Sequence, residues 1–175
     1  MNQLRSNPYK NRGVTLVEVM IVIAIVGVIA GYAVPSYRGM IERNQLKQVA
    51  ESFKSDMQFA RTEAIKRNQS VFLSPTVGNA GTWCYGLNSA AACTCGTAGS
   101  CGIKTIAGND FSNAVSLTAS TGDTEFDFRR GTPSATTDVT FATANYTARI
   151  NVNETGRVLI CTPSGTTGLP GYPDC

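Results

Sequence analysis

Glu18 is the residue of this 175-residue chain whose charge most clearly requires a partner, because it is the only charged side chain between residues 14 and 34. As a helix with a rise of about 1.5 Å per residue, that apolar stretch would be roughly 31 Å long, enough to cross the core of a bilayer. Carrying an acid into lipid costs about 3 kcal/mol, and such an acid is normally paired. The sequence therefore predicts a specific cationic partner for Glu18.

The chain can make this cation itself if it is cut after Gly13. The stretch from 14 to 34 has no basic residue, but a cut would leave an amino group on Val14 with a pKa of about 8. Glu18 lies four residues further on, one helical turn away. The alternative is a plain single-pass anchor in which the Glu18 side chain reaches back to the membrane surface.

The stretch "RGVTLVEVMIVIAIVGVIA" resembles the class III signal of type IV pilins and of type II secretion pseudopilins. The resemblance implies that a prepilin peptidase removes a leader, residues 1–13, and that the new amino terminus at Val14 is methylated. It also implies that Glu18 docks the subunit into a helical filament by pairing with the Val14 amine of a neighbour. The chain departs from the family pattern at Val14, where phenylalanine is usual.

Three basic residues, Arg5, Lys10 and Arg12, precede the apolar run without an acid among them, which is consistent with a cytoplasmic amino terminus. With this orientation, the resemblance implies a single-pass protein of the inner membrane with its head in the periplasm, later found in a pilus on the cell surface. Basic residues also follow the run, so charge alone does not fix this orientation.

All six cysteines follow the apolar run, and the chain has no histidine and no CxxC pair, so disulfides are favoured over a zinc site. Cys161 and Cys175 enclose a tail rich in Gly and Pro, and we expect them to pair. The other four are expected to hold the low-complexity loop onto itself: Cys84, Cys93, Cys95 and Cys101. No metal and no cofactor are expected.

A long helix is expected in two parts, an apolar part over 14–35 and an amphipathic part over 36–70. Pro35 should end or kink the helix, because it lacks a backbone donor. Apolar residues then recur in steps of three and four, which predicts one buried face. They are Leu46, Val49, Ala50, Phe53, Met57, Ala60 and Ala64. The charged residues between them are expected on a solvated surface.

The region 71–175 is expected to form a β-rich head, because short apolar runs are separated by Gly, Asn, Ser and Thr clusters. Strands are expected near 71–74, 83–87, 103–106, 115–118, 125–128, 139–142, 147–152 and 157–161. They are too closely spaced for intervening helices. The expected fold class is α+β, with one long helix packed against an antiparallel sheet.

The segments "FARTEA", "FDFRRG" and "NETGRV" together resemble the GspH/FimT group of minor pilins and pseudopilins. This resemblance and the leader cover nearly the whole chain, apart from the loop 88–101 and the last dozen residues. We expect Gly156 to form a turn with positive φ between two strands, which would place Arg157 at a strand start on the surface.

Enzymatic chemistry has poor candidates, since the chain lacks histidine and any nucleotide-binding glycine loop. Asp123, Glu125 and Asp127 alternate, which would place three carboxylates on one strand face. A solvated edge strand explains this pattern better than a metal site does. The sequence therefore favours a protein that is not an enzyme.

The resemblance implies a minor pilin of a type IV pilus, at or near the tip, that helps to prime assembly. Its implied partners are other major and minor pilins, the prepilin peptidase/N-methyltransferase and the inner-membrane assembly platform. Two alternatives stay open. One is a pseudopilin of a type II secretion system. The other is a DNA-binding minor pilin for DNA uptake, with Arg157 and Arg149 as candidate contacts, although the family's second arginine after Arg157 is missing.

Overall fold

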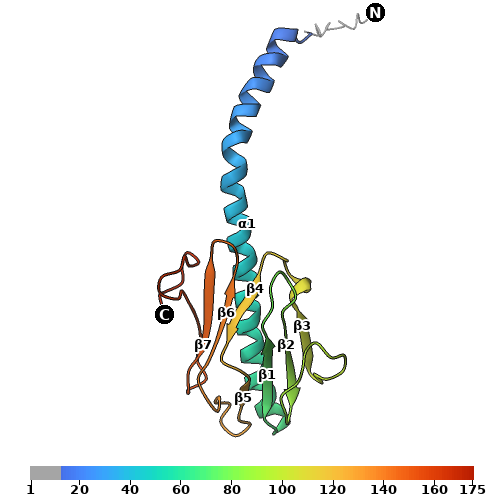
Figure 1. The fold of residues 1–175 in the computed structure, drawn as a ribbon, viewed down its shortest axis with the longest axis vertical. Coiled ribbons are helices and arrows are strands. Elements are labelled where there is room, and N and C mark those ends of the chain that lie inside the picture. The colour runs from blue at the N-terminus through green and yellow to red at the C-terminus, as the bar shows by residue number, and fades with distance from the viewer. Residues whose placement is uncertain (1–12) are drawn as a thin grey trace, which may run out of the picture. The chain divides into compact units, whose positions relative to one another are not determined.

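The computed structural model describes residues 13–175, and describes residues 32–36 by their backbone alone. The chain forms two compact units, one ending at Gly39 and one comprising Met40–Cys175 (Figure 1). One α-helix, α1 (Leu16–Arg67), contributes to both units. Apart from Gly13, the expected leader lies outside the described residues.

The helix α1 continues through Pro35, so the chain does not end its helix there. A kink at Pro35 stays a prediction. The helix ends instead at Arg67, where Asn68 adopts a φ of 52°. The N–H of Asn68 donates to the carbonyl of Ile65, and the N–H of Gln69 donates to that of Ala64. This is a Schellman motif, which satisfies carbonyl groups at the helix end.

In the first unit, apolar side chains are exposed around the described part of α1. Val17 is 63% exposed, Met20 64% and Ile23 65%. Among the residues that the structure describes, no helix is both long and apolar enough to cross a membrane.

In the second unit, the predicted apolar stripe of α1 is buried. Its seven members are at most 1% exposed, from Leu46 to Ala64. The spacing of three and four residues places them on one side of the helix, as expected. They form one hydrophobic core with the inward-facing residues of the strands.

Eight strands follow α1, and each lies where the sequence indicates one. They are β1 (Val71–Thr76), β2 (Cys84–Ser89), β3 (Lys104–Ala107), β4 (Ser116–Ser120), β5 (Thr124–Phe126), β6 (Thr137–Ala142), β7 (Thr147–Val152) and β8 (Val158–Cys161). A single turn of 3-10 helix, η1 (Gly108–Asp110), follows β3. Burial alternates along β6 and β7, because one face of the sheet is on the core.

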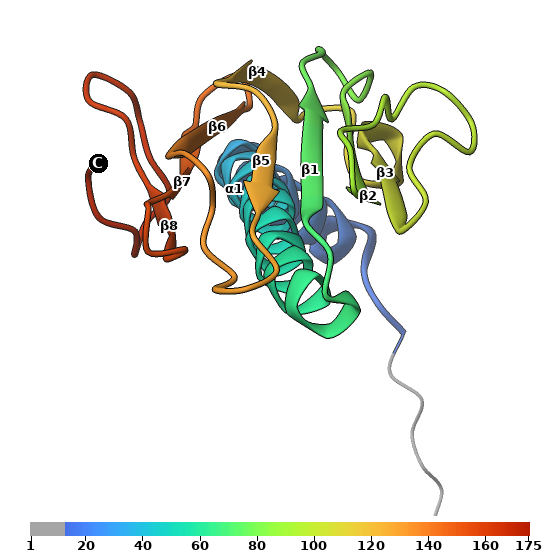
Figure 2. The same cartoon turned by 90° about the horizontal axis from the view of Figure 1, so that it is seen from below.

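The strands form two antiparallel sheets, where the sequence analysis expected one. The first has the order β3-β2-β1-β5 and the second β4-β6-β7-β8. Gly78 and Leu117 exchange two backbone hydrogen bonds between the sheets. Viewed from below, both sheets lie over one face of α1, the first toward the right and the second toward the left (Figure 2). Hydrophobic spacing locates strands but does not specify which strands pair, so the division was not visible in the sequence.

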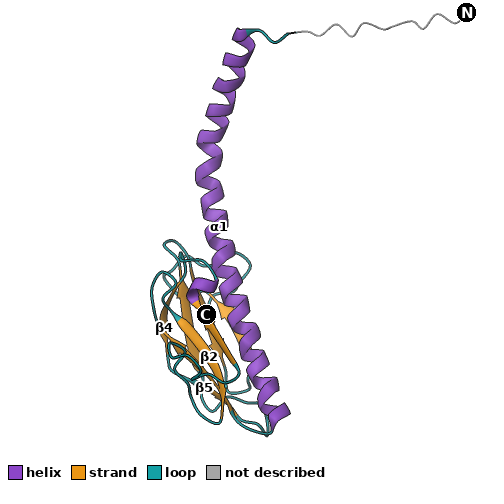
Figure 3. Cartoon of the chain, turned by 90° about the vertical axis from the view of Figure 1, so that its right-hand side faces the viewer, coloured by secondary structure: helices purple, strands orange, loops and turns teal. Residues whose placement is uncertain are grey.

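Phe53 on α1 links the two sheets in the core. Its ring makes edge-to-face contacts with Tyr85 on β2 and Phe141 on β6, with centroids 4.8 and 5.4 Å apart. Both sheets lie against the same helix (Figure 3). The buried Trp83 contacts Phe141 at 5.2 Å and donates its indole N–H to the carbonyl of Val115 at 2.8 Å. Aromatic pairs of this geometry add to the energy of burial.

Candidate functional site

The candidate processing and assembly site lies where α1 begins. Gly13, Val14 and Thr15 are exposed and precede the helix, which starts at Leu16. The Thr15 hydroxyl accepts a hydrogen bond from the N–H of Glu18 at 3.3 Å. Glu18 thus lies in the first turn, where the positive end of the helix dipole stabilises an acid. The peptide bond after Gly13 is outside the helix, one turn before Glu18.

The sequence analysis missed the cap at Thr15, although the signal is present. Thr15 followed three residues later by Glu18 is the pattern of a capping box, in which a side chain at the cap accepts from the third residue of the helix. Half of that exchange is present here. The half that is present uses the backbone N–H of Glu18 and not its carboxylate, so the cap does not compete with the pairing role that the resemblance implies.

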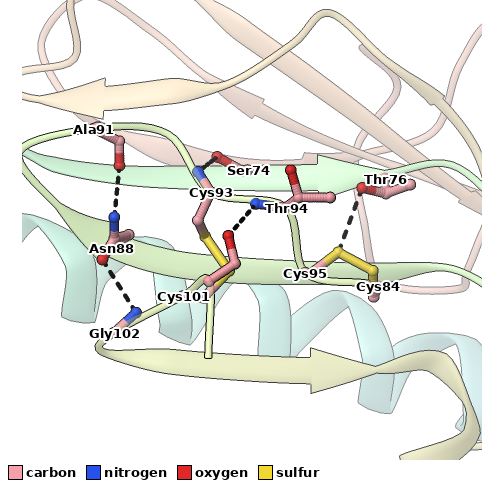
Figure 4. Close-up of a disulfide and its surroundings, with 11 residues drawn as sticks. Ser74, Thr76, Cys84, Asn88, Ala91, Cys93, Thr94, Cys95, Cys101 and Gly102 are labelled. Atoms are coloured by element: carbon pink, nitrogen blue, oxygen red, sulfur yellow. Dashed lines mark hydrogen bonds between the residues drawn. A yellow bond between two sulfur atoms is a disulfide. The ribbon is translucent and has the colours of Figure 1, made fainter. Parts of the chain in front are cut away.

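The disulfides divide into two groups, as the sequence favoured. Cys84 is bonded to Cys95 and Cys93 to Cys101, so both bonds lie within the loop 84–101 (Figure 4). Asn88 also ties this loop, because its amide donates to the carbonyl of Ala91 and accepts from the N–H of Gly102, both at 3.1 Å. These bonds fix a loop that has little apolar sequence of its own.

The third disulfide joins Cys161 to Cys175 and closes the tail after β8. Thr162 forms a parallel bridge with Asp174. The tail also contacts α1, since the hydroxyl of Tyr172 donates to Glu51 at 2.6 Å. Burial and this bond to a carboxylate raise the pKa of Tyr172 to about 12. The tail is thus attached to both the second sheet and the helix.

The charged side of α1 is only in part the solvated surface that the sequence predicted, because Lys47, Lys66 and Arg67 are exposed but two acids are buried. Asp56 is 5% exposed and Glu63 is 6% exposed. Asp56 accepts hydrogen bonds from Lys104 at 2.6 Å and from the hydroxyl of Tyr85 at 2.8 Å. Glu63 accepts from Arg67 at 2.6 Å, and this bond lowers the pKa of Glu63. Two sheets cover a wider face of the helix than one sheet would, and these acids lie within that covered face. Because a buried charge is costly without a partner, each acid is paired.

A line of exposed, uncharged residues runs along α1 in the second unit, and the exposed Lys66 lies at its end. The line consists of Ile41, Asn44, Gln48, Ser55, Phe59 and Thr62. These residues recur at helical spacing, and Ile41 and Phe59 are 41% and 42% exposed. An uncharged helix face with exposed apolar side chains suits contact with another protein surface better than it suits water.

Three sequence segments singled out above meet at the end of the head where α1 stops. A Cβ atom at Gly131 would lie 3.0 Å from Cγ of Arg61, and one at Gly156 would lie 3.1 Å from the carbonyl oxygen of Gly131. Gly131 and Gly156 have φ values of 62° and 77°. The Gly156 turn lies between β7 and β8 as expected, and Arg61 packs beside both turns.

The candidate DNA contacts lie apart. Arg157 is exposed directly before β8, whereas Arg149 is half-buried within β7. Arg149 pairs with Cys161 in the ladder, so its backbone is about four rows, roughly 13 Å, from Arg157. The expected strand near 125–128 ends earlier, and Arg129 and Arg130 lie in a turn after β5. The chain leaves β5 after Phe126, because Gly131 allows a turn there.

The three alternating acids flank or lie in β5, an edge strand of the first sheet. Asp123 is exposed, while Glu125 and Asp127 are half-buried. Within residues 13–175, no group of three or more metal-ligating side chains is close enough to hold an ion.

A helix with an exposed, leader-like start that packs against antiparallel sheets defines a pilin-like protein. The profile of the family described as type II transport protein GspH matches residues 49–156, and the prokaryotic N-terminal methylation motif matches residues 8–34. The chain belongs to the GspH family. This family and this fold are those of filament subunits rather than of enzymes.

The chain is also similar to a solved structure in fold and to curated fimbrial proteins over a short stretch. The crystal structure of the type IV minor pilin FimU from Pseudomonas aeruginosa has a TM-score of 0.50 at 14% identity, covering 68% of this chain and 90% of that one. The type IV major fimbrial protein FimA of Dichelobacter nodosus is 47% identical over 38 residues, 22% of this chain. Fimbrial protein EcpB of Eikenella corrodens is 46% identical over 41 residues, 23% of this chain. The chain spans about a quarter of the length of these two curated relatives, 24% and 26%.

Proposed function

We propose that this protein is a minor pilin of a bacterial type IV pilus, incorporated at or near the tip, where it helps to prime assembly. The observation that carries the proposal is the start of α1. An exposed Gly13–Val14 bond lies outside the helix, and Glu18 follows within the first turn. The match of the methylation motif to residues 8–34 supports cleavage at this bond and methylation of Val14.

The proposed mechanism begins with the subunit in the inner membrane and its head in the periplasm. The apolar sequence from 14 to 34 would be covered first by lipid and then by the equivalent helices of other subunits. Both environments are apolar, so little hydrophobic transfer energy is lost in the exchange. The large exposed apolar area of α1 supports a requirement for such a cover.

In the filament, the carboxylate of Glu18 would pair with the Val14 amine of a neighbouring subunit. A buried charge pair adds little net stability because both ions lose water, but a misaligned pair is costly. The pair would therefore set the axial register between helices. Other major and minor pilins are the partners in this step, after the prepilin peptidase/N-methyltransferase has acted and the inner-membrane assembly platform has engaged the subunit.

The uncharged line on the second part of α1 supports the same proposal. With Ile41 and Phe59 exposed on it, this face offers a continuation of the helix contact beyond the apolar run. The acids beside it are already held, Asp56 by Lys104 and Glu51 by Tyr172. Two subunits can therefore approach along this line without bringing unpaired carboxylates together.

Immunogold labelling of pili from cells carrying an epitope-tagged chain tests the proposed position. Label confined to filament ends, together with fewer pili in a deletion strain, is the expected result. Label distributed along the whole filament, or normal piliation in the deletion strain, would contradict the tip and priming roles.

A second candidate is a minor pseudopilin of a type II secretion system, favoured by the name of the matching family. It would use the same leader, the same Glu18 pairing and the same fold. The deletion strain separates the two functions. Loss of protein secretion with normal piliation would assign the chain to secretion.

A further inference from the structure

The second sheet has a hollow on its outer face, lined by both polar and apolar side chains. Its volume is about 370 Å³, and the tail after β8 forms one side of it. Along β7, Ala148, Ile150 and Val152 point into the core, so the alternate residues Arg149 and Asn151 point to the opposite face. Both line the hollow, together with Asp138 from the neighbouring strand β6.

One N–H donor of the Arg149 side chain has no hydrogen-bond partner and is shielded from water. This donor is on the Nε atom, which is buried. Arg149 also takes part in none of the ion pairs found among residues 13–175. A buried donor without an acceptor costs free energy, and a guanidinium presents several donors in a fixed plane. The Nε atom is closed to a ligand as it is to water, but Arg149 lines the hollow and its guanidinium carries further N–H donors there.

Acceptors lie in the same hollow. Asp138 accepts one hydrogen bond, from the amide of Asn151 at 2.6 Å, and this leaves its second carboxylate oxygen and the amide oxygen of Asn151 available. Asp174 in the tail adds another carboxylate to the lining. The hollow therefore offers both donors and acceptors.

This balance of charge selects against charged ligands. An anion drawn to Arg149 would lie near two carboxylates, and an ammonium group drawn to the carboxylates would lie near a guanidinium. A hydroxyl group avoids both conflicts, since it donates and accepts. A ligand with several hydroxyls on one rigid frame can satisfy Asp138 and Arg149 together with little loss of conformational entropy.

We propose that this hollow binds a neutral saccharide. Its volume is about twelve times the roughly 30 Å³ that one water occupies in the liquid, which is enough for a sugar ring with its hydroxyls. Leu159, 37% exposed, and Pro173 supply apolar surface for the C–H groups of a ring. Polar groups that fix orientation beside apolar surface are the usual composition of a ligand site.

The tail gives this hollow its rigid side. Cys161 and Cys175 both line the hollow and are bonded to each other, so the segment cannot move away from β8. The family match covers residues 49–156, so the tail lies outside the matched residues. The saccharide site combines side chains of β6 and β7 with this tail and goes beyond the proposed filament role.

Saturation-transfer NMR on the full chain tests the site. The chain is held in a zwitterionic detergent without a sugar head group, and galactose, mannose, N-acetylglucosamine and lactose are offered at millimolar concentration. Saturation transfer to at least one sugar is expected. Arg149→Gln and, independently, Leu159→Lys should each weaken that binding at least fivefold. The second substitution is on an exposed side chain, so it keeps the test valid if the first unfolds the head.

Arg157→Gln is the matched control, because Arg157 is exposed and does not line the hollow. It should bind as the unmodified chain does. Absence of transfer to all four sugars would overturn the proposal, as would equal binding by Arg149→Gln in a folded head. Sodium acetate and ethylammonium chloride serve as charged probes. If either binds in the hollow more tightly than the sugars, the ligand class assigned here is wrong.

Discussion

The hydroxyl oxygen of Thr15 accepts the backbone N–H of Glu18, with 3.3 Å between the two atoms, at the first turn of α1. The contact fixes the helix start, and the position of Glu18 in the first turn lets the helix dipole stabilise its carboxylate before any neighbour supplies a cation. Cap and dipole together stabilise a helix start that carries a carboxylate. The cap and the intersubunit pairing use different atoms, so substitution can separate them.

Glu18→Ala should leave the head folded and strongly reduce incorporation into filaments, because it removes the carboxylate but not the Thr15 cap. Thr15→Ala is the matched variant. It costs about 1 kcal/mol at the helix start and retains the charge, so it should still be incorporated. Immunoblots of sheared filaments and of membranes measure the two outcomes. Normal recovery of Glu18→Ala in the sheared fraction would contradict the pairing role.

Much of the fold could be predicted from local sequence. Each strand was visible as a short apolar run, and the buried stripe of α1 followed from spacing alone. The continuation of the helix through Pro35 and the burial of two acids on α1 could not be predicted in the same way. Whether Asp56 and Glu63 meet water depends on two sheets closing around the helix, and that pairing is a long-range property.

The candidate sites show the same limit. The Gly156 turn and the Cys161–Cys175 pair were predictable, since each depends on residues close in sequence. The position of Arg149 beside the tail was not, because it depends on the pairing of β7 with β8 and on the return of the chain to Thr162. The Thr15 cap was within reach of sequence reasoning and was missed.

Replacing both Cys161 and Cys175 by serine should lower the free energy of unfolding by about 3 kcal/mol in the chain-entropy model for a loop of this length. The tail has few apolar residues, so the open loop would gain much conformational freedom. Denaturant unfolding of the full chain under oxidising conditions measures the change. An unchanged transition midpoint would show that the tail is held by its other contacts alone.

Asp56→Asn should destabilise the second unit by about 1.5–3 kcal/mol, because it removes a carboxylate that accepts from both Lys104 and Tyr85. Tyr85→Phe should cost less, since Lys104 keeps its partner. Burial and the neighbouring charge of Asp56 hold the pKa of Tyr85 well above its ordinary value, so the hydroxyl donates throughout the neutral range. Lys66→Gln, on a side chain 78% exposed, is the control and should change stability by less than about 0.5 kcal/mol. Equal destabilisation by the three substitutions would contradict the role assigned here to the buried Asp56 carboxylate.

Stability should fall between about pH 10 and pH 12 through Tyr172. Its pKa rises from 10.0 to about 12 on folding, so the folded state holds this proton more tightly than the unfolded state does. The contribution is complete below pH 10 and is lost as the pH rises through 12. Tyrosinate absorbance and the unfolding midpoint, followed together, measure it. Tyr172→Phe should remove this part of the pH dependence, and a profile identical to that of the unmodified chain would count against it.

Gly156→Ala should destabilise the head more than Gly165→Ala does. Both glycines have positive φ, 77° and 78°, so the backbone strain of the two substitutions is similar. A Cβ at Gly156 meets the carbonyl oxygen of Gly131 at 3.1 Å, whereas one at Gly165 meets nothing within 4 Å. The difference in unfolding free energy therefore isolates the contact between the two turns. No difference would mean that the turns do not depend on their close packing.

Intact-mass spectrometry of the protein isolated from its own cells tests the central claim most directly. The account predicts a chain that begins at Val14, carries one methyl group on its amine, and has a mass consistent with three disulfides. A native protein that keeps residues 1–13 would have no amine at Val14 to pair with Glu18, and would contradict the account.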